Sequence, residues 1–300
     1  MKMKSTEYYV KKYLREDLLP TMFCPGCGNI NVLNILIRAI DNVGLDQDKL
    51  VFVSGIGCSS RLPAYIDADG FHTVHGRAIP VATGIKITNP DLHVIVITGD
   101  GDLSAIGMSH FLHAIRRNIG ITVICVNNEN YGMTGGQASP TTPLFDITPT
   151  TPYKSIEHSF NLSAIAKSAG ATFVARWTVA HSHKAIKSME KALTKNGFAF
   201  VEMLSSCPIG RKDKFKSPRE IIKYYLNESV LYKEVEDLDL SSERAFKKIE
   251  DLFSIIGKEG KMVIVKQRAV FVGNKFHSGL NAWGSLFDED IKELHDFLFK

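Results

Sequence analysis

The 300-residue chain contains no apolar run long enough to cross a bilayer, which takes about 20 consecutive apolar residues. Its first five residues have no apolar segment behind them, so we expect no secretory leader. The net charge is only +4, which is too small to indicate nucleic-acid binding, although it would suit an acidic protein partner. These absences predict a cytoplasmic globular protein that binds neither membranes nor nucleic acid.

Cysteine is also scarce, with five residues, and we expect no disulfides in a cytoplasmic chain. Cys125 falls in an apolar segment and is predicted to be a structural thiol. The other four lie in loop-like sequence rich in glycine, proline and serine, and they are Cys24, Cys27, Cys58 and Cys207. One CxxC pair with two distant cysteines could hold a [4Fe–4S] cluster. Zinc, which usually takes two CxxC pairs, and a redox dithiol remain open alternatives.

The most specific pattern lies between residues 92 and 137. A buried strand predicted at 92–98 ends in GDGD, and a second at 121–126 ends in NNEN. The carboxyl ends of neighbouring parallel strands line one crevice, and glycines there let the backbone approach a phosphate. One carboxylate with amide and carbonyl oxygens suits Mg²⁺. The segment therefore predicts a site for a diphosphate and Mg²⁺.

The GDGD sequence has two other interpretations, one as a binding motif and one as a structural turn. A dinucleotide-binding GxGxxG fingerprint is excluded because Ser104 stands where the third glycine belongs. The remaining structural alternative is a simple strand-to-helix turn in which Asp102 caps the helix.

Strands and helices alternate through the first two thirds of the chain. Further strands are predicted at 50–54, 172–177 and 198–204, and helices at 32–43, 161–169 and 180–195. Asn29 or Asn31 is expected to cap the helix that Gly44 ends. This alternation predicts an α/β fold with a mostly parallel sheet and helices on both faces.

Two regions depart from this alternation. Residues 133–152 form a long loop rich in threonine and proline, and loops of that length are usually functional. From residue 211 onward the sequence is heavily charged, with weak helices expected at 218–226 and 241–256 and strand-like runs at 261–266 and 270–272. We therefore predict a cofactor-binding domain at 1–210 and, at 211–300, a C-terminal extension that wraps this domain or a partner.

The motifs GDGD at 99–102, NN at 127–128 and YGMTGGQ at 131–137 resemble the thiamine-diphosphate motif. They are most similar to the β subunits of the 2-oxoacid:ferredoxin oxidoreductases. CPGCG near the start, GCS before the HGRA segment, and SCP after the last core strand resemble the cluster site of that family. The resemblance spans residues 20–212 and implies a thiamine-diphosphate-binding fold of the diphosphate-binding type.

The resemblance also implies roles for individual residues. The Mg²⁺ ligands would be Asp100, the Asn128 side chain and the Asn130 backbone carbonyl, and the cluster ligands Cys24, Cys27, Cys58 and Cys207. The cofactor contacts would be Ile56, Gly57, Cys58, Ser59, His75, Gly76, Arg77, Ala78, Gly101, Asp102, Gly132 and Met133. His75 and Arg61 are the catalytic candidates, with Arg61 holding a substrate carboxylate. Their alternatives are a satisfied core or capping histidine and a solvated arginine.

By this resemblance the chain is the catalytic β subunit of an enzyme that oxidatively decarboxylates a 2-oxoacid. Coenzyme A would take the acyl group, and electrons would pass through the cluster to ferredoxin. The HGRAIP and MTGGQ segments are most similar to the 2-oxoglutarate branch, with pyruvate or branched-chain acids as alternatives. An α subunit would complete the thiamine site in an αβ or (αβ)2 assembly. A non-redox thiamine-dependent decarboxylase or synthase, or a zinc-bearing assembly protein, are the alternatives from other classes.

Overall fold

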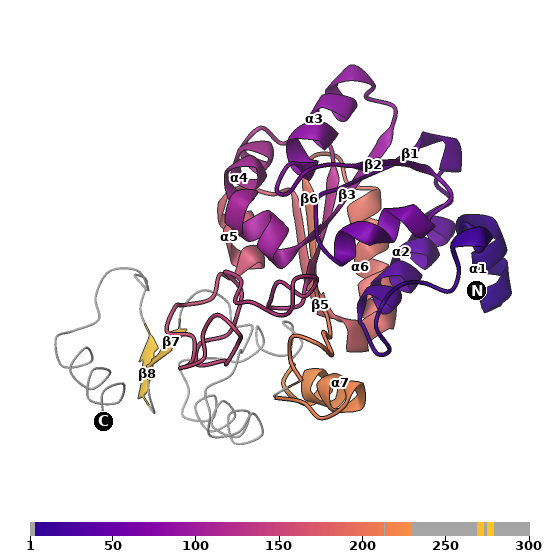
Figure 1. Ribbon diagram of the computed structural model, residues 1–300. Helices are drawn as coiled ribbons and strands as arrows, with labels where there is room; N and C mark the ends of the chain where they lie inside the picture. The colour runs from indigo at the N-terminus through magenta and orange to yellow at the C-terminus, as the bar shows by residue number, and fades with distance from the viewer. Residues whose placement is uncertain (1–3, 213, 230–268, 273–274, 279–300) are drawn as a thin grey trace, which may run out of the picture. The chain divides into compact units, whose positions relative to one another are not determined.

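The structure, a computed structural model, describes residues 4–212, 214–229, 269–272 and 275–278 (Figure 1). The chain divides into two compact units, Met1–Ile222 and Lys223–Lys300. In the second unit, β7 (Ala269–Val272) and β8 (Lys275–Ser278) pair antiparallel, and the strand-like run predicted at 270–272 falls in β7. The elements predicted at 241–256 and 261–266 lie outside the described residues. The predicted boundary at residue 210 stays a prediction.

The first unit is built on a six-stranded parallel sheet in the order β2-β1-β3-β4-β6-β5. Its strands are β1 (Leu50–Ser54), β2 (Asp69–His72), β3 (His93–Gly99), β4 (Thr122–Asn127), β5 (Phe173–Thr178) and β6 (Ala199–Leu204). The predicted α/β class with a parallel sheet is confirmed. The edge strand β2 was not predicted, because all four of its residues are exposed and no burial pattern marks it.

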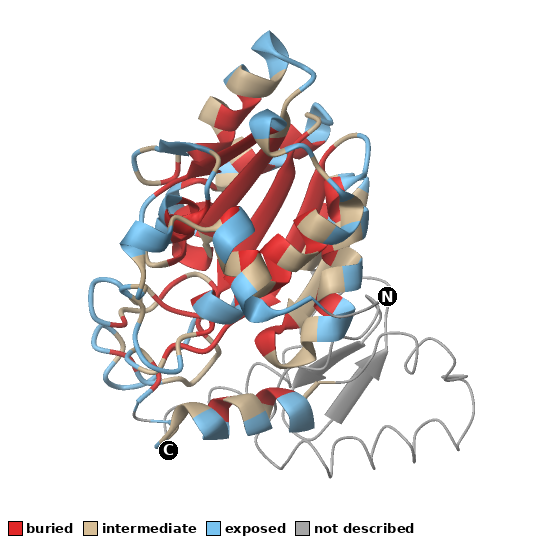
Figure 2. Ribbon diagram, turned by 90° about the vertical axis from the view of Figure 1, so that its right-hand side faces the viewer, coloured by how far each residue is buried: buried red, intermediate tan, exposed pale blue. Residues whose placement is uncertain are grey.

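Helices cover both faces of this sheet (Figure 1). The helices of the unit are α1 (Thr6–Tyr13), α2 (Asn29–Val43), α3 (Ala78–Thr88), α4 (Met108–Arg116), α5 (Leu162–Ser168) and α6 (Ser182–Leu193), with α7 (Pro218–Asn227) at its end. Buried residues of α3, α4 and α5 form one apolar cluster with alternate residues of the strands. Helices α2 and α6 pack on each other over the other face (Figure 1). Figure 2 shows the central strands of the sheet buried, with β1, β4 and β6 buried at every residue, while the helices expose their outer sides.

Short helices of three to seven residues complete the unit. They are η1 (Glu16–Leu18), η2 (Gln47–Lys49), η3 (Ser59–Tyr65), the π-helical η4 (Asp102–Ile106) and η5 (Val179–His181). In the part of the chain that the structure describes, no helix is both long and apolar enough to span a membrane.

The start of α2 differs from the sequence prediction. Gly28 occupies the N-cap position and no side chain caps the helix, so the prediction that Asn29 or Asn31 would cap it is wrong. The Gly28 N–H instead donates to the Ser206 carbonyl at 3.0 Å, and a Cβ on Gly28 would lie 2.3 Å from Ser205 Oγ. The CPGCG turn therefore packs directly against the segment that precedes Cys207. At the other end, Gly44 closes the helix in the left-handed region, with φ 73°, as predicted.

Candidate functional site

The central strands β3 and β4 deliver the predicted motif residues to one edge of the sheet. Gly99 pairs with Val126 in the β3–β4 ladder, so Asp100 and Asn127 leave the sheet next to each other. A cavity of about 230 Å³ opens at this edge. Its lining contains Ile56, Gly57, Cys58, Ser59, His75, Gly99, Asp100, Gly101, Asp102, Val126, Asn128, Asn130, Tyr131, Gly132, Met133 and Thr134.

Most of the residues predicted to contact the cofactor therefore meet at one cavity. Gly76 and Ala78 line a smaller recess beside it, which also reaches Asp102. Arg61 lies in η3, is exposed, and does not line the cavity. The Arg77 guanidinium donates to the carbonyl oxygens of Gly76 and Ile106, both at 3.3 Å, and so braces the loop before α3. The roles predicted for both arginines stay predictions.

Asp102 joins three loops around the cavity. One carboxylate oxygen, Oδ1, accepts from the backbone N–H groups of Gly76 at 2.7 Å and Ile56 at 3.2 Å, while Oδ2 accepts from the Thr98 hydroxyl at 2.7 Å. His75 Nδ1 also lies 2.8 Å from Oδ1. No side chain caps η4, so the helix-cap interpretation of Asp102 is wrong. Because its carboxylate accepts hydrogen bonds from within the protein, Asp102 could contact an anionic ligand only through its backbone.

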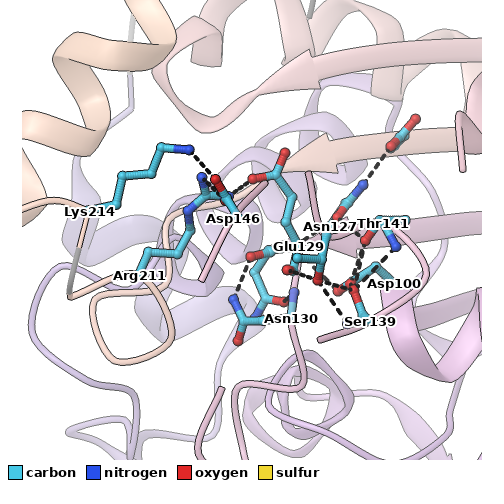
Figure 3. Close-up of polar contacts among 12 residues, drawn as sticks. Asp100, Asn127, Glu129, Asn130, Ser139, Thr141, Asp146, Arg211 and Lys214 are labelled. Atoms are coloured by element: carbon cyan, nitrogen blue, oxygen red, sulfur yellow. Dashed lines mark hydrogen bonds and ion pairs between the residues drawn. The ribbon is translucent and has the colours of Figure 1, made fainter. Parts of the chain in front are cut away.

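Asp100 is held on one side by the long loop that follows β4. Its Oδ2 accepts from the Ser139 hydroxyl at 2.6 Å and the Thr141 hydroxyl at 2.7 Å (Figure 3). Asp100 is only 1% exposed, and this burial raises the pKa of its carboxyl while the two hydroxyls oppose the rise. Neither hydroxyl was singled out from the sequence, because nothing local relates Ser139 or Thr141 to Asp100.

The other oxygen of Asp100 faces two further oxygens. The Asn128 amide oxygen points at Asp100 Oδ1 and at the backbone carbonyl of Asn130, and the turned amide would donate to them at 2.9 and 2.6 Å. Unless the amide turns, three oxygens face one another, which is repulsive without a cation among them. Carboxylate, amide and carbonyl oxygens are the donor set that a hard divalent cation accepts. Asp100, Asn128 and Asn130 could therefore hold Mg²⁺.

The four loop cysteines gather on the same side of the sheet. Burial raises the pKa of the Cys27 thiol to about 11, a hydrogen bond from the Asn29 backbone opposes this, and the Cys207, Cys58 and Cys24 thiols add to the rise. Cys58 also lines the cavity, and a Cβ on Gly132 would lie 3.3 Å from Cys207 Sγ. The thiols thus lie beside the cavity.

Within the described residues, no three Cys, His, Asp or Glu side chains are close enough to share one metal ion. A four-iron cluster binds each thiolate through a different iron and so needs thiolates spaced farther apart. In donor type and number, the four thiols fit such a cluster.

A buried charge cluster lies next to this region and was missed at the sequence level (Figure 3). Arg211 forms an ion pair with Glu129 and lies 3.0 Å from Asp146, which also pairs with Lys214 at 2.5 Å. This charge cluster connects the turn after β4, the long loop at 133–152 and the segment after Cys207. Charged residues in loops ordinarily remain solvated, so the sequence carried no signal for this cluster.

Comparison with known families agrees with this geometry. The family model described as "Thiamine pyrophosphate enzyme, C-terminal TPP binding domain" matches residues 55–203, which begin directly after β1 and contain the cavity loops, β2 to β5 and β6 up to its last residue. Fold and cavity therefore define a thiamine-diphosphate-binding domain of the predicted type.

Individual relatives narrow the class. The 2-oxoglutarate synthase subunit KorB of Methanocaldococcus jannaschii is 51% identical over 76% of this chain and 85% of that protein. Subunit beta of 2-oxoacid:ferredoxin oxidoreductase 2 from Aeropyrum pernix is 44% identical over 62% of this chain and 60% of that one. The chain belongs to the family of β subunits of the 2-oxoacid:ferredoxin oxidoreductases.

A solved relative supports the same placement. It is the 2-oxoglutarate:ferredoxin oxidoreductase from Magnetococcus marinus with 2-oxoglutarate, coenzyme A and succinyl-CoA bound. This chain is 41% identical to it, with a TM-score of 0.64, over 66% of this chain and 68% of that one.

Proposed function

We propose that the chain is the catalytic β subunit of a cytoplasmic 2-oxoglutarate:ferredoxin oxidoreductase that forms an acyl-CoA and CO₂. The observation that carries the proposal is that Asp100, Asn128 and Asn130, which follow the carboxyl ends of β3 and β4, line one cavity. The printed names of the relatives with 51% and 41% identity support the choice of substrate.

In this proposal Mg²⁺ is held by Asp100, Asn128 and the Asn130 carbonyl, and a diphosphate lies against the cavity loops. Thiamine diphosphate would supply the nucleophilic carbon and the electron sink for decarboxylation. The chain's own residues bind and orient it: Gly101, Gly132 and Met133 line the cavity, and Asp102 fixes the loops that carry Ile56 and Gly76. His75 would exchange a proton or donate to a cavity ligand, with Asp102 orienting its ring.

The redox half rests on the four thiols at Cys24, Cys27, Cys58 and Cys207, which we assign to a [4Fe–4S] cluster. The position of Cys58 in the cavity lining would place that cluster beside the decarboxylation site, as electron transfer requires. Ferredoxin would accept the electrons, and coenzyme A the acyl group. An α subunit would supply the other half of the thiamine site, so this chain alone is expected to be inactive. Arg61 stays our candidate for a substrate carboxylate, reached once the α subunit is in place.

The test uses this chain co-expressed with its α subunit and purified without oxygen. We expect about four irons and four sulfides per β chain, bound thiamine diphosphate, and CoA-dependent reduction of ferredoxin by 2-oxoglutarate. Pyruvate and branched-chain 2-oxoacids are measured in parallel. Serine in place of Cys24, Cys27, Cys58 or Cys207 should remove the iron, whereas Cys125→Ser, in the buried strand β4, should keep it.

Each alternative has its own result. Stoichiometric zinc without iron or thiamine diphosphate would identify an assembly protein instead. Thiamine-dependent decarboxylation without a cluster would identify a non-redox enzyme. No turnover of 2-oxoglutarate, with turnover of another acid, would overturn the substrate assignment alone.

A further inference from the structure

The long loop after Tyr131 covers Asp100 with hydroxyl groups. Its central sequence, Ser-Pro-Thr-Thr-Pro at 139–143, has three buried hydroxyl residues, with Ser139 8%, Thr141 4% and Thr142 3% exposed. Loop residues of these types are ordinarily exposed, so a buried set that all contacts one site requires an explanation. Figure 3 shows Ser139 and Thr141 beside Asp100, on the opposite side of the close-up from the Arg211 charge cluster.

The two hydroxyls bind one carboxylate oxygen of Asp100 and not the other. Ser139 and Thr141 both reach Oδ2, at 2.6 and 2.7 Å, whereas Oδ1 accepts from the Asn128 backbone N–H at 3.4 Å and faces the Asn128 side-chain amide. A carboxylate free to rotate about its Cβ–Cγ bond could present either oxygen or both. Two hydroxyl donors on Oδ2 hold the plane of the carboxylate. Oδ1 is then the oxygen of Asp100 that faces the Asn128 side chain.

The Thr141 hydroxyl in turn contacts Asn127, whose orientation is fixed by a buried carboxylate. Thr141 Oγ1 lies 3.1 Å from Asn127 Oδ1, and the Asn127 amide nitrogen donates to Glu202 at 2.8 Å. Glu202 is fully buried, so the Asn127 nitrogen must face it and the Asn127 oxygen must face Thr141. The Thr141 hydroxyl has a single hydrogen, which it can donate to one acceptor at a time. Because Asn127 Oδ1 already accepts from the Glu129 N–H at 3.0 Å, that hydrogen is left for Asp100.

The loop also holds the turn after β4 directly. Thr142 Oγ1 donates to the Glu129 carbonyl at 2.8 Å and accepts from the Ser139 N–H at 2.8 Å. The same short segment therefore fixes both Asp100 and the backbone that carries the Asn128 and Asn130 oxygens. Pro140 and Pro143 restrict the backbone on either side, which reduces the entropy lost when this segment is ordered.

We propose that Ser139 and Thr141 are positioning residues for the divalent metal, holding Asp100 so that only its Oδ1 is offered as a ligand. This inference rests on the proposed function, because it assigns a support to that metal site. Outer partners of this kind typically change metal affinity by about 10- to 100-fold when they are removed. Each substitution also removes a buried hydrogen bond and therefore lowers stability, so metal binding is compared with that of a control variant that loses a buried hydroxyl elsewhere.

The test measures Mn²⁺ binding to the complex of this chain with its α subunit, by electron paramagnetic resonance, with thiamine diphosphate present. Thr141→Val and Ser139→Ala should each weaken Mn²⁺ binding by about 10-fold or more. Thr141→Ser keeps the hydroxyl and should restore it to within about threefold of wild type. Thr122→Val is the matched control. Thr122 is buried at the opposite end of β4, and its hydroxyl donates to the Ala192 carbonyl at 3.2 Å.

The outcomes separate the inference from the proposed function. If Thr141→Val binds Mn²⁺ as tightly as Thr141→Ser does, the positioning role is overturned. It is also overturned if Thr122→Val weakens Mn²⁺ equally, since the effect would then be one of general stability. If the wild-type complex binds neither Mn²⁺ nor thiamine diphosphate, the proposed function fails first.

Discussion

Glu129 and Arg211 form a buried ion pair that joins the turn after β4 to the segment after Cys207. The two side chains are 6% and 5% exposed. Glu129 adopts a left-handed backbone conformation with φ 62°, which turns its side chain out of the NNEN sequence toward Arg211. The loops of the candidate metal site and of the candidate cluster site are therefore held to each other by charge.

Removing the cation should be strongly destabilising. Arg211→Met keeps much of the side-chain volume but leaves the buried Glu129 carboxylate and Asp146 without their guanidinium. We expect a loss of about 3–5 kcal/mol in unfolding free energy, measured by urea unfolding. Lys214→Met is the comparison and should lose about 1 kcal/mol or less, because the Lys214 side chain is 27% exposed. Equal losses in the two variants would contradict the buried pair as the main contributor.

Asp102→Asn tests whether this residue organises the cavity loops. The amide presents a donor where the carboxylate accepts from Gly76, Ile56 and Thr98, so at least one buried donor loses its partner. Thiamine diphosphate binding to the α–β complex should weaken by about 1–3 kcal/mol, or about 5- to 150-fold, in a calorimetric titration. Asp67→Asn, an exposed residue ahead of β2, should bind as wild type does. Unchanged affinity in Asp102→Asn would remove Asp102 from the site.

Gly210→Ala should disturb the metal site from the cysteine side. A Cβ at Gly210 would lie 2.3 Å from Asn130 Oδ1, and the Asn130 amide is fixed by its bond to the Asn128 carbonyl at 2.6 Å. Relieving this overlap must move the turn that carries Asn128 and Asn130. Mn²⁺ affinity of the complex should therefore fall by about 10-fold.

The matched control for that substitution is Gly84→Ala in helix α3. A Cβ there meets nothing within 4 Å, and alanine favours a helix by about 0.5–1 kcal/mol over glycine. This variant should bind Mn²⁺ normally and unfold at a slightly higher temperature. A Gly210→Ala variant that binds Mn²⁺ equally well would show that the turn is free to adjust.

Asp41 should make stability depend on pH in the acid range. Burial alone would raise the pKa of Asp41, but hydrogen bonds from Lys4, Tyr8, Tyr13 and Lys12 outweigh it and lower the pKa from 3.8 to about 2. Because the folded pKa is the lower one, the stabilisation is complete above about pH 5. It is lost as the pH falls from 3.8 toward 2.

The size of this effect is about 1–2 kcal/mol, smaller than the full shift implies because solvent screens the two lysines. It is measured as the change in urea midpoint between neutral and acid pH. Asp41→Asn should show a shallower acid decline than wild type, and an identical decline in both would rule out the Asp41 contribution.

The general fold could be read from the sequence because its signals are local. The β-branched apolar runs before GDGD and NNEN predicted β3 and β4 to within a residue of where His93 and Thr122 begin them. The exposed strand β2 and the uncapped start of α2 were missed. In both places a tertiary neighbour, β1 or the Ser205–Ser206 backbone, provides the hydrogen bonds that local sequence would otherwise have to supply.

The sequence by itself determined the class of the fold and placed the GDGD and NNEN residues at one edge of the sheet, since chain order and strand ends dictate both. Only the tertiary structure decided how those residues are used. Asp102 accepts from two loops and from β3, Thr141 holds Asp100 across 41 residues, and Asn127 meets Glu202 across 75. Hydrogen bonds between such distant residues depend on how the loops pack over the sheet, which local propensity does not encode. Burial then makes each of these bonds costly to break, because the partner left behind has no water to replace it.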